Sequence, residues 1–338
     1  MRLEDVRQRL RSAGAGPRHE TLALRAWVRG LPLDAFARKR NSAFPKSLLA
    51  GLPAIQSEFA TLTRVRSEHA GEDGSARLVL ELADGQTIES VLLPNDGVCV
   101  SSQAGCAVGC TFCMTGTLGL LRQLGSAEIV AQVSLARSRR TVRRVVFMGM
   151  GEPAHNLENV MEAIELFGTE GALGHKNLVF STVGDRRVFE RLPQGPVKPA
   201  LALSLHTTKA ELRAELLPRA PRFDPAELVL LAQEYSRATT YPIQYQWTLL
   251  EGVNDGDDEL DALAELLRGQ YAVVNFILYN KVDGLPHTRT APERARELVR
   301  GMMQRGVLAK LRVSAGQDVD GGCGQLRARE LSRIPAGS

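Results

Sequence analysis

Cysteines are rare in this chain, and their spacing is the first sign of chemistry. Four of the five fall within residues 98–114, VCVSSQAGCAVGCTFCM, and the fifth is Cys323. Cys106, Cys110 and Cys113 have the spacing C-x3-C-x2-C, which lets three thiolates bind one iron–sulfur cluster. A [4Fe–4S] cluster normally takes four cysteines, so three leave one iron open to a substrate. The alternatives are an incomplete zinc site or unrelated cysteines, although zinc sites usually show paired C-x2-C or histidine spacing.

The elements before the cysteines change from helical to extended. The first sixty residues have helical apolar periodicity, and residues 44–59 predict two short helices broken at Gly51-Leu52-Pro53. Residues 76–94 alternate across Asp84-Gly85, which predicts a β-hairpin. The sequence therefore predicts a small helical module followed by a hairpin extension.

From about residue 98 the chain alternates between apolar strands and amphipathic helices, which predicts a parallel sheet, open or curled toward a barrel. Several of the strands are almost continuously apolar, as expected when both faces of a sheet are covered. The candidate strands are residues 143–150, 177–183, 198–206, 241–250 and 271–280. In such folds the active site lies at the carboxyl ends of the strands.

Charge is distributed unevenly along the 338 residues. The net charge is +4, but residues 1–46 hold eleven Lys and Arg against four Asp and Glu. A basic arm on a nearly neutral body suggests contact with a polyanion, and a solvated helical surface is the alternative. A second basic run, Arg137 to Arg144, lies between a helix and a strand, where it favours either RNA contact or a solvated helix end.

No apolar run is long enough to span a membrane, and the first residues lack the apolar region of a secretory signal. We therefore expect a cytoplasmic protein, in which clustered thiols stay reduced and serve metal or redox chemistry.

Four blocks in order, VCVSSQAGC, FMGMGEP, ALSLH and DVDGGCGQL, resemble the RlmN/Cfr family of radical S-adenosylmethionine (SAM) RNA adenine methyltransferases. The C-x3-C-x2-C spacing with Phe112 before the last cysteine is the radical SAM part of this resemblance. It implies an α/β fold, a partial (β/α)6 TIM-type barrel. It also implies one [4Fe–4S] cluster held by the three cysteines, with SAM bound at the open iron.

The resemblance also implies residues that bind SAM at the strand ends. Taken alone, GMGEP is typical of a tight turn, and a lone histidine at a strand end is more often structural. The implied SAM contacts are Gly151, Glu152, Ser181, Ser204, Leu205, His206 and Asn280.

The two remaining cysteines receive roles from the same resemblance. Cys323, between glycines, takes a methyl group from one SAM as S-methylcysteine, and a radical from a second SAM lets that carbon add to adenine. Glu89 accepts the ring proton, and Cys99 releases the product by forming a transient disulfide with Cys323. A buried structural role is the alternative for each cysteine, and a surface carboxylate is the alternative for Glu89.

These observations predict three regions: a helical RNA-binding domain (1–62), a β-hairpin extension (63–97) and a catalytic core (98–330). The predicted activity is methylation of carbon 2 or carbon 8 of an adenine in ribosomal or transfer RNA. The expected partners are the RNA and an electron donor such as a flavodoxin or ferredoxin system, and the chain is expected to be a monomer. The alternatives are a radical SAM enzyme acting on a peptide or small molecule, and a non-catalytic metal-containing RNA-binding protein.

Overall fold

The computed structural model describes the whole chain except residues 39–42, 118, 283, 313–323 and 327–338. Cys323 therefore lies outside the described residues, whereas its neighbour Gly324 lies within them. In the described part of the chain, none of the helices combines the length and the apolar character of a membrane span.

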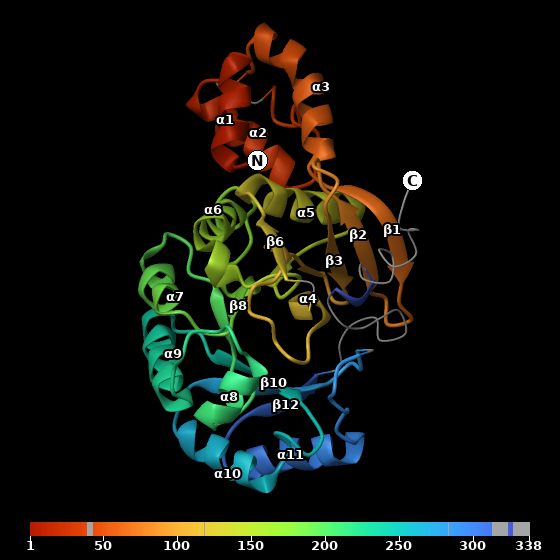
Figure 1. Ribbon diagram of the computed structural model, residues 1–338. Coiled ribbons are helices and arrows are strands. Elements are labelled where there is room, and N and C mark those ends of the chain that lie inside the picture. The colour runs from red at the N-terminus through yellow and green to blue at the C-terminus, as the bar shows by residue number, and fades with distance from the viewer. Residues whose placement is uncertain (39–42, 118, 283, 313–323, 327–338) are drawn as a thin grey trace.

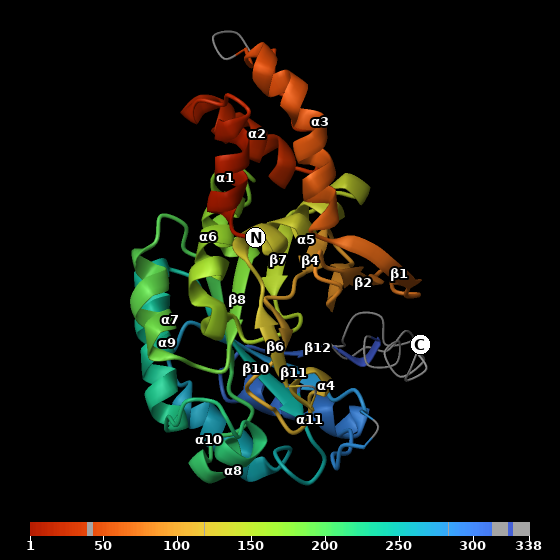
Figure 2. The same ribbon diagram turned by 45° about the horizontal axis from the view of Figure 1, so that its top comes forward.

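The main sheet contains ten strands in the order β1-β2-β3-β4-β7-β8-β9-β10-β11-β12 (Figures 1 and 2). From β4 onward every neighbouring pair is parallel, whereas β1 to β4 pair antiparallel. The strands are β1 Arg64–Ala70, β2 Ala76–Glu81, β3 Thr87–Leu93, β4 Gly97–Cys99, β7 Arg144–Phe147, β8 Leu178–Thr182, β9 Ala200–Ser204, β10 Ile243–Leu249, β11 Ala272–Leu278 and β12 Ala309–Arg312. A separate hairpin pairs β5 Gln103–Gly105 with β6 Leu120–Gln123.

Helices cover the outer face of the parallel strands, and three more form a module at the N-terminal end (Figures 1 and 2). The α-helices are α1 Leu3–Ser12, α2 Pro17–Val28, α3 Lys46–Thr61, α4 Met114–Thr117, α5 Ser126–Arg139, α6 Leu157–Gly168, α7 Arg186–Arg191, α8 Ala210–Leu216, α9 Pro225–Thr239, α10 Asp257–Leu266 and α11 Pro292–Gln304. Short 3-10 helices lie at Pro153–Asn156, His175–Asn177 and Leu192–Gln194.

The predicted α/β class with a partial barrel is confirmed, and its sheet has seven successive parallel strands instead of six. The seventh, β12, has only four residues, so its sequence pattern was too short to predict a strand. Along β7 and its neighbours, alternate side chains point into the barrel or out to the helices. Val145 and Phe147 belong to the main core, whereas Val146 packs inside the barrel with Val179 and Ala202.

One prediction about the first hundred residues is wrong, whereas the predicted hairpin is confirmed as part of a larger sheet. Residues 44–59 do not form two short helices, because Lys46–Thr61 is one helix that contains Pro53. Pro53 lies on the exposed side, and the buried stripe Leu48, Leu52, Ile55 and Phe59 holds the helix together. The hairpin of β2 and β3 is present, but it is the middle of a four-stranded meander that continues through β4 into the barrel.

Hydrogen bonds and an ion pair hold the helical module, α1 to α3, against the barrel. Leu3 donates its backbone N–H to the Ser126 hydroxyl over 2.8 Å, and Arg25 forms an ion pair with Glu170 at 2.7 Å. Arg137 donates to the carbonyl oxygen of Val28 over 3.1 Å, which ties the end of α2 to α5. These contacts fix the position of the module above α5 and α6 (Figure 2).

Candidate active site

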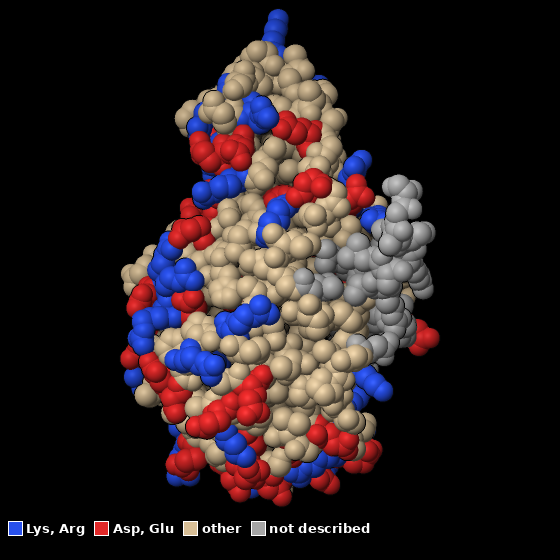
Figure 3. All heavy atoms as spheres, in the orientation of Figure 1, with Lys and Arg blue, Asp and Glu red and all other residues tan. Residues whose placement is uncertain are grey.

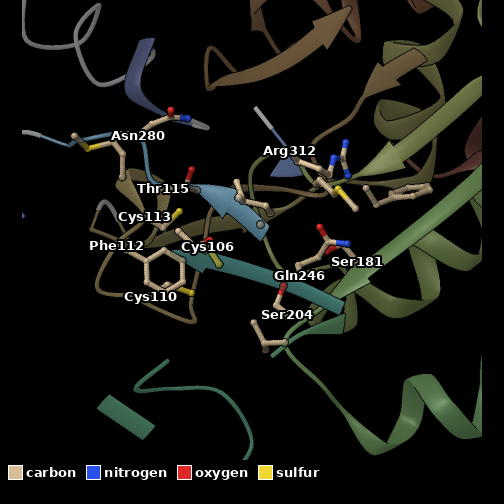
Figure 4. Close-up of a pocket in the computed structure, with 18 of the residues that line it drawn as sticks. Cys106, Cys110, Phe112, Cys113, Thr115, Ser181, Ser204, Gln246, Asn280 and Arg312 are labelled. Atoms are coloured by element: carbon tan, nitrogen blue, oxygen red, sulfur yellow. The ribbon is translucent and has the colours of Figure 1, made fainter. Parts of the chain in front are cut away.

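A pocket of about 540 Å³ opens at the carboxyl ends of the parallel strands and extends into the barrel (Figure 4). The segment that holds the three clustered cysteines, residues 106–113 (the cysteine loop), forms one side of this pocket. Polar residues of the strands form its floor. Its lining includes Cys106, Cys110, Phe112, Cys113, Gly151, Glu152, Ser181, Ser204, His206, Gln246, Asn280, Arg144 and Arg312. Most residues predicted as site residues from the sequence therefore meet in one place.

The cysteine loop is closed at its base by the small hairpin of β5 and β6. Cys106 donates its backbone N–H to the carbonyl oxygen of Gly119 over 2.9 Å, where the two strands meet. At the far side of the loop, the backbone N–H of Thr111 donates to Leu216 over 3.0 Å, and the Thr111 hydroxyl lies 2.9 Å from Nε2 of His287. A loop fixed at both ends can hold three thiols in place before any metal binds.

Burial makes the thiols of Cys106 and Cys110 poor acids in the absence of a metal. Burial, together with the neighbouring Cys113 and Glu152, raises the pKa of Cys106 to about 12. Burial also raises the pKa of Cys110 well above its ordinary value, and the neighbouring cysteines add to the effect. These two thiols are therefore protonated near neutral pH, and a metal centre has to displace their protons.

The donor set fits an iron–sulfur cluster better than a single ion. Within the described residues, no group of three or more His, Cys, Asp or Glu side chains converges as the ligands of one metal ion would. Three thiols with no fourth protein ligand match a cluster of several irons that keeps one position open. Phe112 packs edge-on against His206 at 4.9 Å and covers this side of the pocket with apolar surface.

The turn after β7 brings backbone close to the pocket. Gly151 has φ of +102°, and a Cβ atom there would lie 2.6 Å from Cβ of Gln103, so only glycine fits without strain. Glu152 follows, and its carboxylate accepts backbone N–H groups from Ala154 at 3.0 Å and Val183 at 2.9 Å. Burial raises the pKa of Glu152 to about 7 despite these hydrogen bonds. Glu152 is thus a buried acceptor positioned to receive a cationic group.

His206 lies just past β9 and is held as a neutral hydrogen-bond donor. Its Nδ1 accepts the backbone N–H of Thr248 over 3.0 Å, so the proton sits on Nε2. Burial lowers the pKa of His206 to about 3, and the charge of Arg213 lowers it further. The residue adopts φ of +66°, which is unusual for a side chain other than glycine and points to a functional constraint.

Ser181, Ser204 and Asn280 line the same pocket from three different strands or strand ends, as expected from the sequence. Leu205 is different: its side chain is fully buried in the main core and does not line the pocket. Strand alternation explains this, because the residue after the inward-facing Ser204 points outward to the helices. Any contact from Leu205 to a ligand in the pocket has to come from its main chain.

The pocket residues that were not predicted as site residues include Gln246, Arg144 and Arg312, although Arg144 ends the basic run noticed in the sequence. Gln246 on β10 is 4% exposed and donates an Nε2 hydrogen to the Gln244 carbonyl over 3.1 Å, and its buried Oε1 has no hydrogen-bond partner among the described residues. Arg144 begins β7 and Arg312 ends β12, and both line the pocket. Their inward orientation depends on strand register, which a sequence pattern does not specify.

Glu89 lies on β3 with its carboxylate buried beside the pocket. Oε2 of Glu89 is 3.4 Å from Nη1 of Arg77, and both side chains are almost completely buried. The same oxygen accepts the backbone N–H of Gly324 over 3.0 Å. Gly324 also packs so tightly on Thr115 that a Cβ atom would lie 2.5 Å from its hydroxyl oxygen. The segment after Cys323 is therefore docked between Glu89 and the cysteine loop.

Cys99, at the end of β4, is buried inside the barrel with Val146 and Val179. Its side chain packs against apolar neighbours, and it does not belong to the pocket lining described above. It lies close enough to Arg312 for the two groups to interact electrostatically. Cys99 therefore borders the inner end of the pocket, on the Arg312 side.

The arrangement agrees with comparisons to known proteins. Residues 100–267 match the model of the Radical SAM superfamily. The chain is similar to a "probable RNA methyltransferase" of Aromatoleum aromaticum, with 69% identity over 98% of this chain and 94% of that protein. A protein of the same description from Leptothrix cholodnii is 66% identical over 98% of this chain and 96% of its own length. A crystal structure of a radical SAM methyltransferase from Sphaerobacter thermophilus aligns with a TM-score of 0.81 and 33% identity, covering 97% of this chain and 98% of the other.

The chain belongs to the radical SAM methyltransferases. The superfamily implies a [4Fe–4S] cluster and SAM as cofactors, and the three thiols, the buried Glu152 acceptor and the open pocket of this radical SAM methyltransferase fit them. The three cysteines, Gly151 and Glu152 line one pocket at the same edge of the sheet.

Several cations of the two basic regions of this radical SAM methyltransferase form ion pairs or hydrogen bonds within the protein, and residues 39–42 of the first region lie outside the described residues. In the helical module, arginines at positions 2, 9, 11 and 25 form ion pairs with glutamates. In the second run, Arg139 pairs with Glu68, Arg143 pairs with Asp96, and Arg140 donates to main-chain carbonyls. Figure 3 accordingly shows basic and acidic residues interspersed on the visible face. Arg144 is the member of the second run that faces the pocket.

Proposed function

We propose that this enzyme methylates a ring carbon of an adenine in RNA through an S-methylcysteine on Cys323. In this proposal Cys106, Cys110 and Cys113 hold the cluster. Gly151, Glu152, Ser181, Ser204, His206 and Asn280, with the main chain of Leu205, bind SAM. Glu152 would accept the SAM ammonium group, because it is a carboxylate at the pocket wall.

The observation that carries the proposal is the position of Gly324. It is joined to Cys323 by one peptide bond, and its N–H contacts Glu89 although 235 positions separate the two residues. Gly324 follows Cys323 directly in the chain and itself lies beside the proposed proton acceptor and the cysteine loop, which supports Cys323 as the proposed carrier. A carrier attached far from the pocket would have spoken against a methyl shuttle.

When bound, SAM and the reduced cluster supply the methyl group and the carbon-centred radical that removes a hydrogen atom from it. The Cys323 thiolate receives the methyl group by displacement, and the same carbon later bonds to the adenine ring. Restoring the aromatic ring requires the loss of one electron, which the bound cluster would take back, and of the ring proton, which Glu89 accepts. The Cys99 thiolate then attacks the Cys323 sulfur, which breaks the bond between that sulfur and the transferred carbon and leaves a disulfide. The released carbon takes up a proton and becomes the methyl group. Two electrons from a thiol reductant restore both cysteines.

RNA is proposed as the substrate because relatives that are 69% and 66% identical to this chain are named "probable RNA methyltransferase". An adenine inside folded RNA would have to leave its stack to reach this pocket. The same proposal includes RNA binding by the helical module and electron supply by a flavodoxin or ferredoxin system. The methylated atom is proposed to be carbon 2 or carbon 8 of the adenine. A peptide or small-molecule substrate is the competing function, and it would not require Cys99 or Cys323.

Trapping of the covalent intermediate tests the proposal. Cys99→Ala protein, expressed in growing cells and purified under denaturing conditions, is expected to carry covalently bound RNA, because the adduct cannot be resolved. Nuclease digestion and sequencing of that RNA would identify the target adenosine.

The matched control is the double variant Cys99→Ala/Cys323→Ala, which removes the carrier and should carry no RNA. Turnover that survives Cys323→Ala with a peptide or small molecule would favour the competing function. Cys99→Ala protein that is free of RNA, from cells in which the wild type is active, would overturn the shuttle.

A further inference from the structure

Two arginines from distant parts of the chain face the inner end of the pocket. Arg144 is the first residue of β7 and Arg312 is the last residue of β12, near opposite ends of the parallel part of the sheet. Both line the pocket, and in Figure 4 Arg312 lies away from Cys110 and Phe112. The curvature of the sheet therefore brings together two cations that the sequence separates by more than 160 positions.

Burial lowers the pKa of both guanidinium groups, and the charge of Arg144 lowers that of Arg312 further. The two positive charges therefore repel each other in a partly desolvated site. Such an arrangement destabilises the protein unless an anion binds between or beside them.

Neither guanidinium has a hydrogen bond or an ion pair with any residue of the described chain. Neighbouring arginines differ: Arg139 lies 2.5 Å from Glu68, and Arg143 lies 3.4 Å from Asp96. The acidic residues that line the same pocket are Glu152, which accepts two backbone N–H groups, and Asp73, an exposed residue of the β1–β2 turn. The main chain keeps Arg144 in place, because its N–H donates to the Asp96 carbonyl over 3.1 Å.

We propose that Arg144 and Arg312 bind a phosphate group of the RNA strand next to the target nucleotide. This inference rests on the proposed function. Arginine side chains bind phosphate through two parallel hydrogen bonds, and two of them on one anion form a strong, oriented clamp. A phosphate held at the inner end of the pocket would fix the register of the strand, so that the flipped base lies between this clamp and the cysteine loop.

The carboxylate of SAM is the other anion in the reaction. The three cysteines place the cluster, and therefore the amino acid end of SAM, on the side of the pocket away from Arg312 (Figure 4). RNA phosphate is consequently favoured, and SAM carboxylate becomes an outcome that the experiment distinguishes.

The test compares Arg144→Gln/Arg312→Gln with Arg143→Gln/Arg139→Gln, which removes two charges from neighbouring positions outside the pocket. The probe is a pool of unmodified transcripts of transfer RNA and large-subunit ribosomal RNA fragments, bound to reconstituted holoenzyme over a series of KCl concentrations. A second measurement records SAM affinity and RNA-independent cleavage of SAM.

We expect the pocket double variant to bind the RNA pool about tenfold to hundredfold more weakly, as for the loss of charge-assisted hydrogen bonds. The slope of log affinity against log salt should fall by about 0.7 for one phosphate on a single strand. SAM affinity and SAM cleavage should stay within about twofold of wild type. The variant should unfold at the same or a higher temperature, because the mutual repulsion is gone, and Arg144→Lys/Arg312→Lys should retain the salt slope.

Three results would overturn the inference. An unchanged salt slope and affinity for RNA would make the pair structural, and a selective loss of SAM affinity would assign it to the SAM carboxylate. A loss of RNA binding equal to that of the control double variant would mean that Arg144 and Arg312 contribute only their general positive charge. If the wild type itself binds none of the RNA pool, the proposed substrate fails first, and this inference fails with it.

Discussion

Arg77 and Glu89 meet across strands β2 and β3, with Nη1 and Oε2 3.4 Å apart and both side chains buried. The pairing is diagonal, because Glu89 lies opposite Val79 and Arg77 lies opposite Val91 in the register. This contact sets a cation beside the carboxylate at the position where Gly324 also binds it. A single ion pair thus connects the stability of the meander with the proposed proton acceptor.

Glu89→Gln should affect both the stability of the fold and the proposed proton transfer. It removes the carboxylate charge that faces Arg77 at 3.4 Å in a buried ion pair, so we expect a loss of roughly 3–5 kcal/mol in the free energy of unfolding. It should also stop turnover after the methyl carbon has bonded to RNA. Chemical denaturation and mass spectrometry of RNA adducts measure the two effects.

The control is Arg77→Met/Glu89→Gln, which removes both charges of this pair. Its stability should return to within about 1 kcal/mol of wild type while turnover stays absent. Recovery of activity together with stability would show that Glu89 serves the fold and not the proton transfer.

Gly151→Ala is expected to damage both folding and SAM binding. A Cβ atom at φ of +102° would approach Cβ of Gln103 to 2.6 Å, so backbone and side chain have to shift. We expect a loss of about 1–3 kcal/mol in the free energy of unfolding, with at least tenfold weaker SAM binding by calorimetry.

Gly252→Ala is the matched control, since Gly252 has φ of +68° and open space around its missing side chain. It should lower the free energy of unfolding through backbone strain and leave SAM affinity unchanged. Equal effects of the two substitutions on SAM binding would remove the special role of Gly151.

The raised pKa of Glu152 predicts that the stability of the protein without its cofactors depends on pH. Burial raises its pKa to about 7 from an ordinary value of 4.5, and Asp185 adds a smaller increase. The folded protein therefore binds this proton more tightly than the unfolded chain does. The associated stability is fully present below pH 4.5, falls as the pH rises, and is lost above about pH 7. The shift corresponds to about 3 kcal/mol.

Glu152→Gln should abolish this contribution, which thermal unfolding between pH 5 and pH 8 would detect as a flatter profile than that of wild type. SAM affinity of the wild type should increase through about pH 7, because the ionised carboxylate binds the ammonium group. A wild-type SAM affinity that is independent of pH would speak against this contact.

Gln246→Leu should weaken SAM binding and leave the fold intact. The substitution removes a buried oxygen that has no partner in the described protein, and also one hydrogen bond to Gln244. We expect stability within about 1 kcal/mol of wild type. Because Gln246 pairs with Ser204 in the strand register, SAM affinity should fall about tenfold. Gln246→Glu, which retains an acceptor, should bind SAM better than Gln246→Leu.

Sequence patterns were sufficient where chemistry is local. The C-x3-C-x2-C spacing, the turn after residue 150 and the apolar strands each occupy one short segment, and the structure places the cysteines and the strand-end residues in one pocket. Short-range patterns failed at α3, where the buried stripe outweighs one exposed proline, and at β1 and β12. Those two strands exist because neighbouring strands pair with them, not because of a strong pattern of their own.

The sequence by itself determined which residue types this protein has for its chemistry: three closely spaced thiols, a carboxylate after a glycine turn, and two cysteines far apart. Only the tertiary structure decided which side chains face the inside of the barrel. Strand register and sheet curvature turned Leu205 outward and Gln246 inward, and brought Arg144 to Arg312 and Glu89 to Gly324. Side-chain direction reverses with every residue along a strand, so a one-residue difference in register separates a core residue from a site residue.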